Sequence, residues 1–283
     1  MPPTSKKPLA ASARPANDPA MRAEDTLMVQ SVEKAFRVLL AFDVGREMLS
    51  LSQIVDATGL NKSAAQRFTH TLLQLGYLVK DEKTRHYGLT PKTLDLGYRY
   101  SRSSSLVERA QHYLLHLSRT TEETVNLTML EGTDVIFVSR QVSHHVLNTD
   151  VMTGSRRPAY CTAPGIAMLS RIPIEQARLV LDQSDLRAHT PHTTWQMPAL
   201  LAKLKKAALD GFAMTVEELT IGDITTAAAI LGADGRPVGA ISISASRLRF
   251  TPEDGVVRFA PLVTAAAQAM SKSGPTLRGP RLR

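Results

Sequence analysis

Residues 49–79, LSLSQIVDATGLNKSAAQRFTHTLLQLGYLV, predict two short helices joined by a tight turn and followed by a strand. Ser50 can cap the first helix, because its hydroxyl can accept a hydrogen bond from a free N–H of the first turn. Gly59 supplies the permissive backbone of the turn, and Asn61 can cap the second helix. Helical spacing gives each helix an apolar face. These faces comprise Leu51, Ile54, Val55 and Leu60, then Ala65, Phe68, Leu72 and Leu75.

The face of the second helix opposite its apolar stripe is crowded with hydrogen-bonding groups. A packed helix has no need of so many on one short face, whereas a helix in the major groove uses them to reach phosphates and base edges. The pattern predicts a DNA-binding helix-turn-helix, and an ordinary amphipathic helix pair with a solvated face remains the alternative. The forked guanidinium of Arg67 suits either a phosphate or a guanine. The candidate DNA contacts are Lys62, Ser63, Gln66, Arg67 and His70.

A predicted hairpin follows the second helix. Gly76 ends that helix and leads into YLVKDEKTRHYGLT, where apolar runs at 77–79 and 87–89 flank a polar tip. Such a pattern is typical of a β-hairpin, or wing. Arg85 and His86 are further candidate DNA contacts. Before the helix pair, residues 27–44 predict a supporting helix whose buried stripe comprises Val32, Ala35, Phe36, Leu39 and Leu40.

Three segments resemble the IclR-type bacterial transcriptional regulators: SVEKAFRVLLAF, LSLSQIVDATGLNKSAAQRFTHTLLQLGYLVKD and RHYGLTPKTLDLG. The likeness extends from about Val29 to Met270. It implies an α+β fold in two domains, an N-terminal winged helix-turn-helix and a C-terminal GAF-like α/β domain that binds an effector. It also implies a homodimer, or a tetramer built from two dimers, acting on a near-palindromic operator in double-stranded DNA.

Length and composition agree with two domains. A chain of 283 residues that is 43% hydrophobic can bury two compact cores. It has no run of about 18 apolar residues and no charged-then-apolar leader, so we expect neither a membrane span nor secretion. The single cysteine, Cys161, excludes an internal disulfide framework and suits a reducing cytoplasm. We expect no metal and no cofactor.

The net charge of +8 is unevenly distributed. It is +2 over residues 26–90 and +1 over residues 91–271, whereas the last twelve residues carry +4. Only the first domain and the tails therefore suit a polyanion. The expected divisions are a disordered arm (1–25) that either touches DNA or is passive, the winged domain (26–90), a linker helix (91–105), the effector-binding domain (106–271) and a basic tail (272–283).

The second domain is expected to begin with a helix and a hairpin, whose strands are VNLTML and DVIFVSRQV. Residues 153–169, TGSRRPAYCTAPGIAML, then form a loop that runs into a helix beginning near Ala163 or Pro164, with Thr162 as its cap. The free N–H groups of that helix could receive a carboxylate. By resemblance this segment is the lip of the effector pocket, which implicates Ala163 and Pro164.

Helices at 173–183 and 197–211 are expected next, then strands around 212–219, 224–233 and 238–246, and a closing helix at 252–271. In ISISAS the two serines share one strand face, which lies either in a pocket or in solvent. Family members carry a G-x-x-C-x-A-A-P phrase that here is GDITTAAA, and Thr215 replaces a frequent aspartate. The resemblance therefore adds Thr215, Thr225, Ser242 and Ser244 as candidate effector contacts.

The leading hypothesis is a DNA-binding regulator whose operator affinity or activity is switched by a small metabolite. By resemblance, that effector is an organic acid, a carboxylate from carbon or aromatic catabolism. A second hypothesis is a cysteine-dependent hydrolase or transferase in which Cys161, with a pKa lowered beside a helix N-terminus and near His144 and His145 in the sequence, attacks the substrate. A third is a winged helix that only docks proteins.

Overall fold

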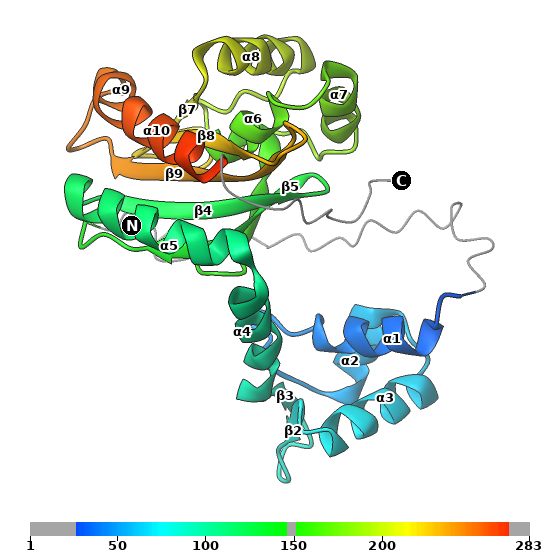
Figure 1. Ribbon diagram of the computed structural model, residues 1–283. Coiled ribbons are helices and arrows are strands. Elements are labelled where there is room, and N and C mark those ends of the chain that lie inside the picture. Colours follow the sequence, from blue (N-terminus) through cyan, green and yellow to red (C-terminus); the bar gives the residue numbers. More distant parts are fainter. Residues whose placement is uncertain (1–26, 146–150, 272–283) are drawn as a thin grey trace, which may run out of the picture. The chain divides into compact units, whose positions relative to one another are not determined.

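A computed structural model describes residues 27–145 and 151–271 of the chain (Figure 1). The expected arm at 1–25 and the expected basic tail at 272–283 lie outside the described residues. The chain divides into two compact units, the first ending at Asp95 and the second beginning at Leu96. No helix in the described ranges is long and apolar enough to cross a membrane.

The first unit combines three helices with a small antiparallel sheet. Its helices are α1 (Gln30–Leu39), α2 (Leu51–Thr58) and α3 (Lys62–Gln74), and its strands are β1 (Met48–Leu49), β2 (Leu78–Lys80) and β3 (Tyr87–Leu89). The strand order is β1-β3-β2. The expected helix pair and hairpin are confirmed. Strand β1 could not be predicted from the sequence, because two residues are too few to show an alternating pattern.

The core of the first unit corrects the expected face of α1. Val38 is fully buried, whereas Val32, Phe36 and Leu40 are 53%, 48% and 77% exposed. The helix has apolar residues on more than one side, and only its packing against the other two helices decides which side is buried. Leu75 is likewise exposed, because it lies just past the end of α3. The buried residues are Val38, Leu49, Ile54, Leu60, Ala65, Leu72, Leu78 and Tyr87.

A helical segment follows the wing. A 3₁₀ turn, η2 (Pro91–Thr93), leads into α4 (Leu94–Ser103), and α5 (Ser105–Thr121) begins after a single intervening residue, Ser104. The Ser104 hydroxyl accepts a hydrogen bond from the N–H of Val107 at 3.4 Å, so it caps α5. The linker helix expected at 91–105 therefore corresponds to η2 and α4 and ends just before Ser104.

The second unit is built on a six-stranded antiparallel sheet in the order β6-β5-β4-β9-β8-β7. Glycines with positive φ turn two hairpins, Gly132 the expected one between β4 and β5, and Gly235 the one between β8 and β9. The shortest strand of this sheet, β6, lies where the sequence predicted a loop. The strands are β4 (Thr124–Glu131), β5 (Asp134–Gln141), β6 (Arg156–Pro158), β7 (Ala213–Val216), β8 (Asp223–Leu231) and β9 (Pro237–Ser246).

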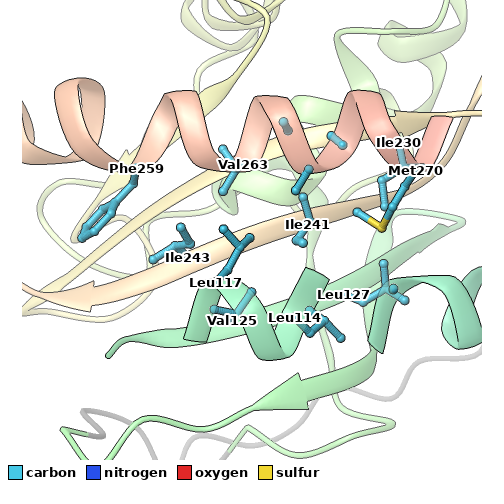
Figure 2. Close-up of a cluster of buried hydrophobic side chains, with 14 of the residues drawn as sticks. Leu114, Leu117, Val125, Leu127, Ile230, Ile241, Ile243, Phe259, Val263 and Met270 are labelled. Atoms are coloured by element: carbon cyan, nitrogen blue, oxygen red, sulfur yellow. The ribbon is translucent and has the colours of Figure 1, made fainter. Parts of the chain in front are cut away.

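Helices cover both faces of this sheet. On one face, α5 and α10 (Ala260–Ser271) pack over a cluster that includes Leu114, Ile241 and Val263 (Figure 2). A short helix α9 (Pro252–Asp254) and a π-helical turn η4 (Gly255–Phe259) lead into α10. On the other face lie α6 (Ala163–Leu169), α7 (Ile174–Asp182) and α8 (Met197–Asp210). The second face also carries the cavity described below.

Candidate functional site

The turn between α2 and α3 is fixed by local hydrogen bonds that the sequence predicts. The Ser50 hydroxyl accepts from the Gln53 N–H at 3.3 Å, and the Gln53 side chain accepts from the Ser50 N–H at 2.8 Å, which is a reciprocal capping box. Gly59 has φ of +66°, and the Asn61 side chain accepts from the Ala64 N–H at 2.8 Å. Both helix starts and the bend between them are therefore rigidly defined.

The polar face of α3 is exposed along its whole length. Ala65 and Thr69 point the opposite way and are fully buried, and the Thr69 hydroxyl donates to the Ala65 carbonyl at 2.9 Å. The helix contains no Asp or Glu, so the charged side chains that it carries, Lys62 and Arg67, are both positive. All five expected DNA contacts lie together on the exposed face: Lys62, Ser63, Gln66, Arg67 and His70.

The wing is organised by one carboxylate at its tip. Asp81 accepts hydrogen bonds from the N–H groups of Lys83 at 2.8 Å and Thr84 at 2.7 Å, and these bonds lower the pKa of Asp81. Arg85 is exposed at the tip and lies 3.5 Å from Glu82. The His86 ring is partly buried, with Nδ1 2.9 Å from the Thr84 carbonyl. Of the two wing candidates, Arg85 is thus the more accessible.

The second unit contains a cavity of about 100 Å³ between the sheet and the start of α6. Ser242 is only 1% exposed, which excludes the solvent-facing alternative for the serine row. The structure brings all six expected effector contacts to this cavity: Ala163, Pro164, Thr215, Thr225, Ser242 and Ser244. They come from α6, β7, β8 and β9, so residues far apart in the sequence line one space.

A chain of hydrogen bonds crosses the cavity floor. The Thr225 and Ser244 hydroxyls lie 2.8 Å apart, and Thr225 also donates to Asp223 at 2.8 Å. The Asn126 amide donates to Ser242 at 3.4 Å and to Ser244 at 3.5 Å. Burial raises the pKa of the Asp223 carboxyl to about 6, although the bond from Thr225 opposes this shift. The floor is therefore polar while much of the surrounding wall is apolar.

Several polar residues of this cavity were not predicted from the sequence as effector contacts, among them Asn126, Arg140 and Asp223. Strand alternation could have indicated the first, because Val125 and Leu127 on either side of it face the apolar core. No comparable local signal separates Arg140 from the other arginines of the chain. Both Asn126 Oδ1 and Arg140 Nε are buried without a hydrogen-bond partner among the described residues.

The start of α6 differs in detail from expectation. Thr162 occupies the N-cap position, but its hydroxyl donates to the Pro158 carbonyl at 3.0 Å and does not accept from the helix, so the predicted side-chain cap is wrong. A 3₁₀ turn, η3 (Ala159–Cys161), precedes the helix and directs the hydroxyl backwards. A Cβ on Gly165 would lie 2.2 Å from the Ala159 carbonyl oxygen, so only glycine allows this close approach.

Cys161 lies beside the cavity but is fully buried. Burial raises the pKa of its thiol to about 12, with the charge of Glu218 adding to the effect, so the expected lowering is wrong. The thiol is therefore protonated near neutral pH and is a poor nucleophile. His112 and His116 lie one turn apart on α5, but the described residues contain no group of three side chains that could hold a metal ion.

Family models match both units. One, described as "Bacterial transcriptional regulator IclR C-terminal", matches residues 98–272, and the other, "IclR helix-turn-helix domain", matches residues 31–82. The Pca regulon regulatory protein of Pseudomonas putida is 31% identical over 245 residues, which is 86% of this chain and 84% of that protein. The p-hydroxybenzoate hydroxylase transcriptional activator of Acinetobacter baylyi is 27% identical, over 91% and 96% of the two chains.

A solved structure agrees with the fold. The crystal structure of an IclR homolog complexed with 4-hydroxybenzoate, from Microbacterium hydrocarbonoxydans, superposes with a TM-score of 0.71 at 21% identity, covering 86% of this chain and 98% of that one. The architecture is thus an N-terminal helix-turn-helix followed by an α/β domain, as the sequence predicts. The chain belongs to the IclR family of bacterial transcriptional regulators.

Proposed function

We propose that this regulator binds an operator through α3 and the wing, and that a small organic acid in the cavity of the second unit changes its affinity for that operator. The observation that carries the proposal is the exposed, acid-free face of α3, positioned by a capped turn. A recognition helix reads base edges mainly through its N-terminal residues. Lys62, Ser63, Gln66 and Arg67 lie there, so we assign them the direct contacts, with His70 and Arg85 further out and His86 as a secondary contact.

The exposed apolar stripe of α1 supports pairing of two chains through the first unit. Val32, Phe36 and Leu40 follow one another at intervals of four residues and are each about half exposed or more. Such a stripe on a helix is typical of a contact between helices. A two-fold pair would present its recognition helices to half-sites about 34 Å apart or a multiple of that distance, on a near-palindromic operator. Association of two such dimers into a tetramer is the larger assembly that we propose.

The size and chemistry of the cavity support a small acidic effector. The cavity of about 100 Å³ is smaller than an engineered apolar cavity of about 150 Å³ that binds benzene, so it suits a ligand no larger than one small ring or a short chain. The hydroxyls and the two guanidinium groups around it, those of Arg140 and Arg157, suit a polar, anionic ligand. The printed names of two relatives refer to Pca and p-hydroxybenzoate regulation, and the solved relative holds 4-hydroxybenzoate. We therefore propose an aromatic or short-chain carboxylate.

The two other hypotheses have less support. A cysteine-dependent hydrolase or transferase needs a reactive thiolate, and the buried, protonated Cys161 argues against one. We therefore propose that the chain is not an enzyme, and that it works in the cytoplasm, where the operator is. A winged helix that only docks proteins would show no steep loss of DNA binding as salt increases.

The test replaces Arg67 by alanine. A duplex is first selected from a random pool by the full-length wild-type chain, and its affinity is then measured by fluorescence anisotropy. Arg67→Ala should lose about 1–3 kcal/mol of binding, which corresponds to a roughly 5–150-fold weaker Kd. Thermal stabilisation by an acid that binds the wild type should not change, because α3 belongs to the other unit.

The matched control is Arg119→Ala, which removes the same side chain from an exposed position on α5 of the second unit. It should bind the selected duplex as the wild type does. Equal binding by the wild type and Arg67→Ala would remove α3 from the DNA interface. Loss of both DNA binding and ligand response in Arg67→Ala would mean that the two units do not have separate roles.

A further inference from the structure

We propose that Arg140 and Asn126 form a two-point recognition site in the cavity, where Arg140 binds the carboxylate of the effector and Asn126 accepts a hydrogen bond from a hydroxyl of the same molecule. This inference rests on the proposed function and specifies the effector as a small hydroxylated carboxylic acid. It assigns the anionic group to the sheet floor instead of the first turn of α6. That helix has only seven residues, so its dipole is a weak anion site.

Strand register places the two side chains next to each other. In the antiparallel pairing of β4 with β5, Asn126 lies directly opposite Arg140, and in the pairing of β4 with β9 it lies opposite Ser242. Directly opposed residues of an antiparallel pair point to the same face of the sheet and are near neighbours. All three line the cavity. A guanidinium, an amide and a hydroxyl thus form one row across the floor.

The guanidinium of Arg140 has unused hydrogen-bonding capacity. Its Nη1 donates to the Val151 carbonyl, its Nε is buried without a partner, and no carboxylate of the described residues forms an ion pair with it. Burial and the nearby charge of Arg157 lower the pKa of Arg140, so the surroundings disfavour its positive charge. An anionic ligand would supply both the missing acceptor and the missing countercharge.

Two other partly buried cations of the second unit differ in this respect. Arg249 pairs with Glu123, and Lys203 pairs with Glu218, each within the protein. The only carboxylate among the described cavity residues, Asp223, already accepts from Thr225. Arg109 Nε is also buried without a partner among the described residues, but Arg109 does not line the cavity. Arg140 combines such a nitrogen with a position in the cavity wall, which indicates a partner that arrives from outside.

Asn126 supplies the second point. The residue lines the cavity and is 2% exposed. Its Nδ2 donates to two serines, while its Oδ1 is buried without a donor among the described residues. A buried acceptor without a partner is costly, so it favours a ligand that brings a donor. A hydroxyl is the donor that small organic acids most simply provide. Acid and hydroxyl together define the class of effector.

The test measures two preferences separately by calorimetry on the full-length chain. The probes are 4-hydroxybenzoate, 3-hydroxybenzoate, benzoate and 4-hydroxybenzamide, with lactate, propionate and lactamide as a short-chain set. The wild type should prefer a hydroxy acid to its amide by about 10–100-fold, because that difference reports a hydrogen bond to a charged group. It should prefer the hydroxy acid to the acid without the hydroxyl by about 2–10-fold, because that difference reports a neutral hydrogen bond.

Each variant should lose one preference and keep the other. Arg140→Gln should bind acid and amide equally but still prefer the hydroxylated probe, whereas Asn126→Ala should show the reverse. Arg157→Gln is the matched control: this arginine also lines the cavity, but unlike Arg140 it has no nitrogen that is buried without a partner among the described residues, and its replacement should keep both preferences. If either variant fails to fold by circular dichroism, Arg140→Met or Asn126→Ser replaces it.

The outcomes separate this inference from the proposed function. If Arg140→Gln keeps the preference for acids, or Arg157→Gln loses it, the inference is overturned while an acid effector stands. If Asn126→Ala keeps the preference for the hydroxyl, the two-point site is also overturned. If no probe acid binds the wild type, both the two-point site and the proposed acid effector are contradicted. Operator binding through α3 is not affected by that result, because the selected duplex tests it independently.

Discussion

Buried ionisable side chains in the second unit differ in how they are compensated. Glu123 is 1% exposed and pairs with Arg249, although burial still raises the pKa of its carboxyl. Asp223 has no cationic partner in the described residues and relies on the Thr225 hydroxyl. An uncompensated buried carboxylate favours its neutral form. Asp223 should therefore make stability depend on pH in a way that a paired carboxylate would not.

Replacement of Asp223 by asparagine should remove that dependence. The folded-state pKa of about 6 lies above the ordinary 3.8, so the folded protein holds this proton more tightly than the unfolded chain does. The stabilising contribution is present below about pH 4 and is lost as the pH rises through about 6. At about 1.4 kcal/mol per unit of pKa, the wild type should lose about 2–3 kcal/mol relative to Asp223→Asn between pH 4 and pH 7.

Urea denaturation of both proteins at intervals across this pH range measures the difference. The other titrating groups are the same in both proteins, so their contributions to the pH dependence of stability cancel when the two unfolding free energies are subtracted. Asparagine can still accept the hydrogen bond from Thr225, so packing is conserved. Parallel stability curves for the two proteins would show that Asp223 is ordinarily solvated, and would remove it from the buried floor of the cavity.

At the scale of the element, the close contact between α6 and the turn before it sets the edge of the cavity. Gly165 lies against the Ala159 backbone, where a Cβ would be 2.2 Å from the carbonyl oxygen and 2.5 Å from Cα. Backbone atoms cannot move aside as a flexible side chain can. Gly165→Ala should therefore destabilise the protein by about 1–3 kcal/mol or more and weaken effector binding, because Ala163 and Pro164 would be displaced.

Gly97→Ala is the control for this prediction. Gly97 lies in α4 with nothing within 4 Å of an added Cβ, so alanine should stabilise the helix by up to about 1 kcal/mol. Thermal unfolding and calorimetry of the two variants provide the comparison. Equal, small effects of both substitutions would mean that α6 does not need to approach the preceding turn so closely.

The elements that the sequence predicts well are those encoded by short-range chemistry. Ser50, Gly59 and Asn61 specify the helix-turn-helix through bonds that span three residues, and the glycine turns specify both hairpins. The buried side of α1 could not be predicted, because it depends on packing between helices. The pairing of Asn126 with Arg140 could not be predicted either, because register between strands is a property of the whole sheet.

At the scale of the whole molecule, we propose that function requires two copies of the chain. We expect Phe36→Lys to weaken association, because a charge placed in a helix-to-helix contact must be desolvated. Analytical ultracentrifugation should show a larger share of monomer, and affinity for the selected duplex should fall with it. Leu209→Lys alters a residue of α8 that is 88% exposed and should leave both unchanged. A dimer as stable as the wild type in Phe36→Lys would exclude α1 from the interface.

Regulation links the two units through a shared free energy. An effector that changes operator affinity by some factor must have its own affinity changed by the same factor when DNA is bound. Coupling of this kind is typically about 1–3 kcal/mol, or roughly 5–150-fold. Without such coupling, the cavity and the recognition helix would be two unrelated binding sites on one chain.

The decisive measurement is therefore a reciprocal titration. The Kd of the full-length chain for its selected duplex is measured with and without saturating 4-hydroxybenzoate, or whichever probe acid binds most tightly, and the Kd for that acid is measured with and without the duplex. We predict that both constants change by one common factor of about 5 or more, and that Arg140→Gln abolishes the response of the DNA affinity to the acid. An acid that fills the cavity yet leaves the affinity for DNA unaltered would contradict this account.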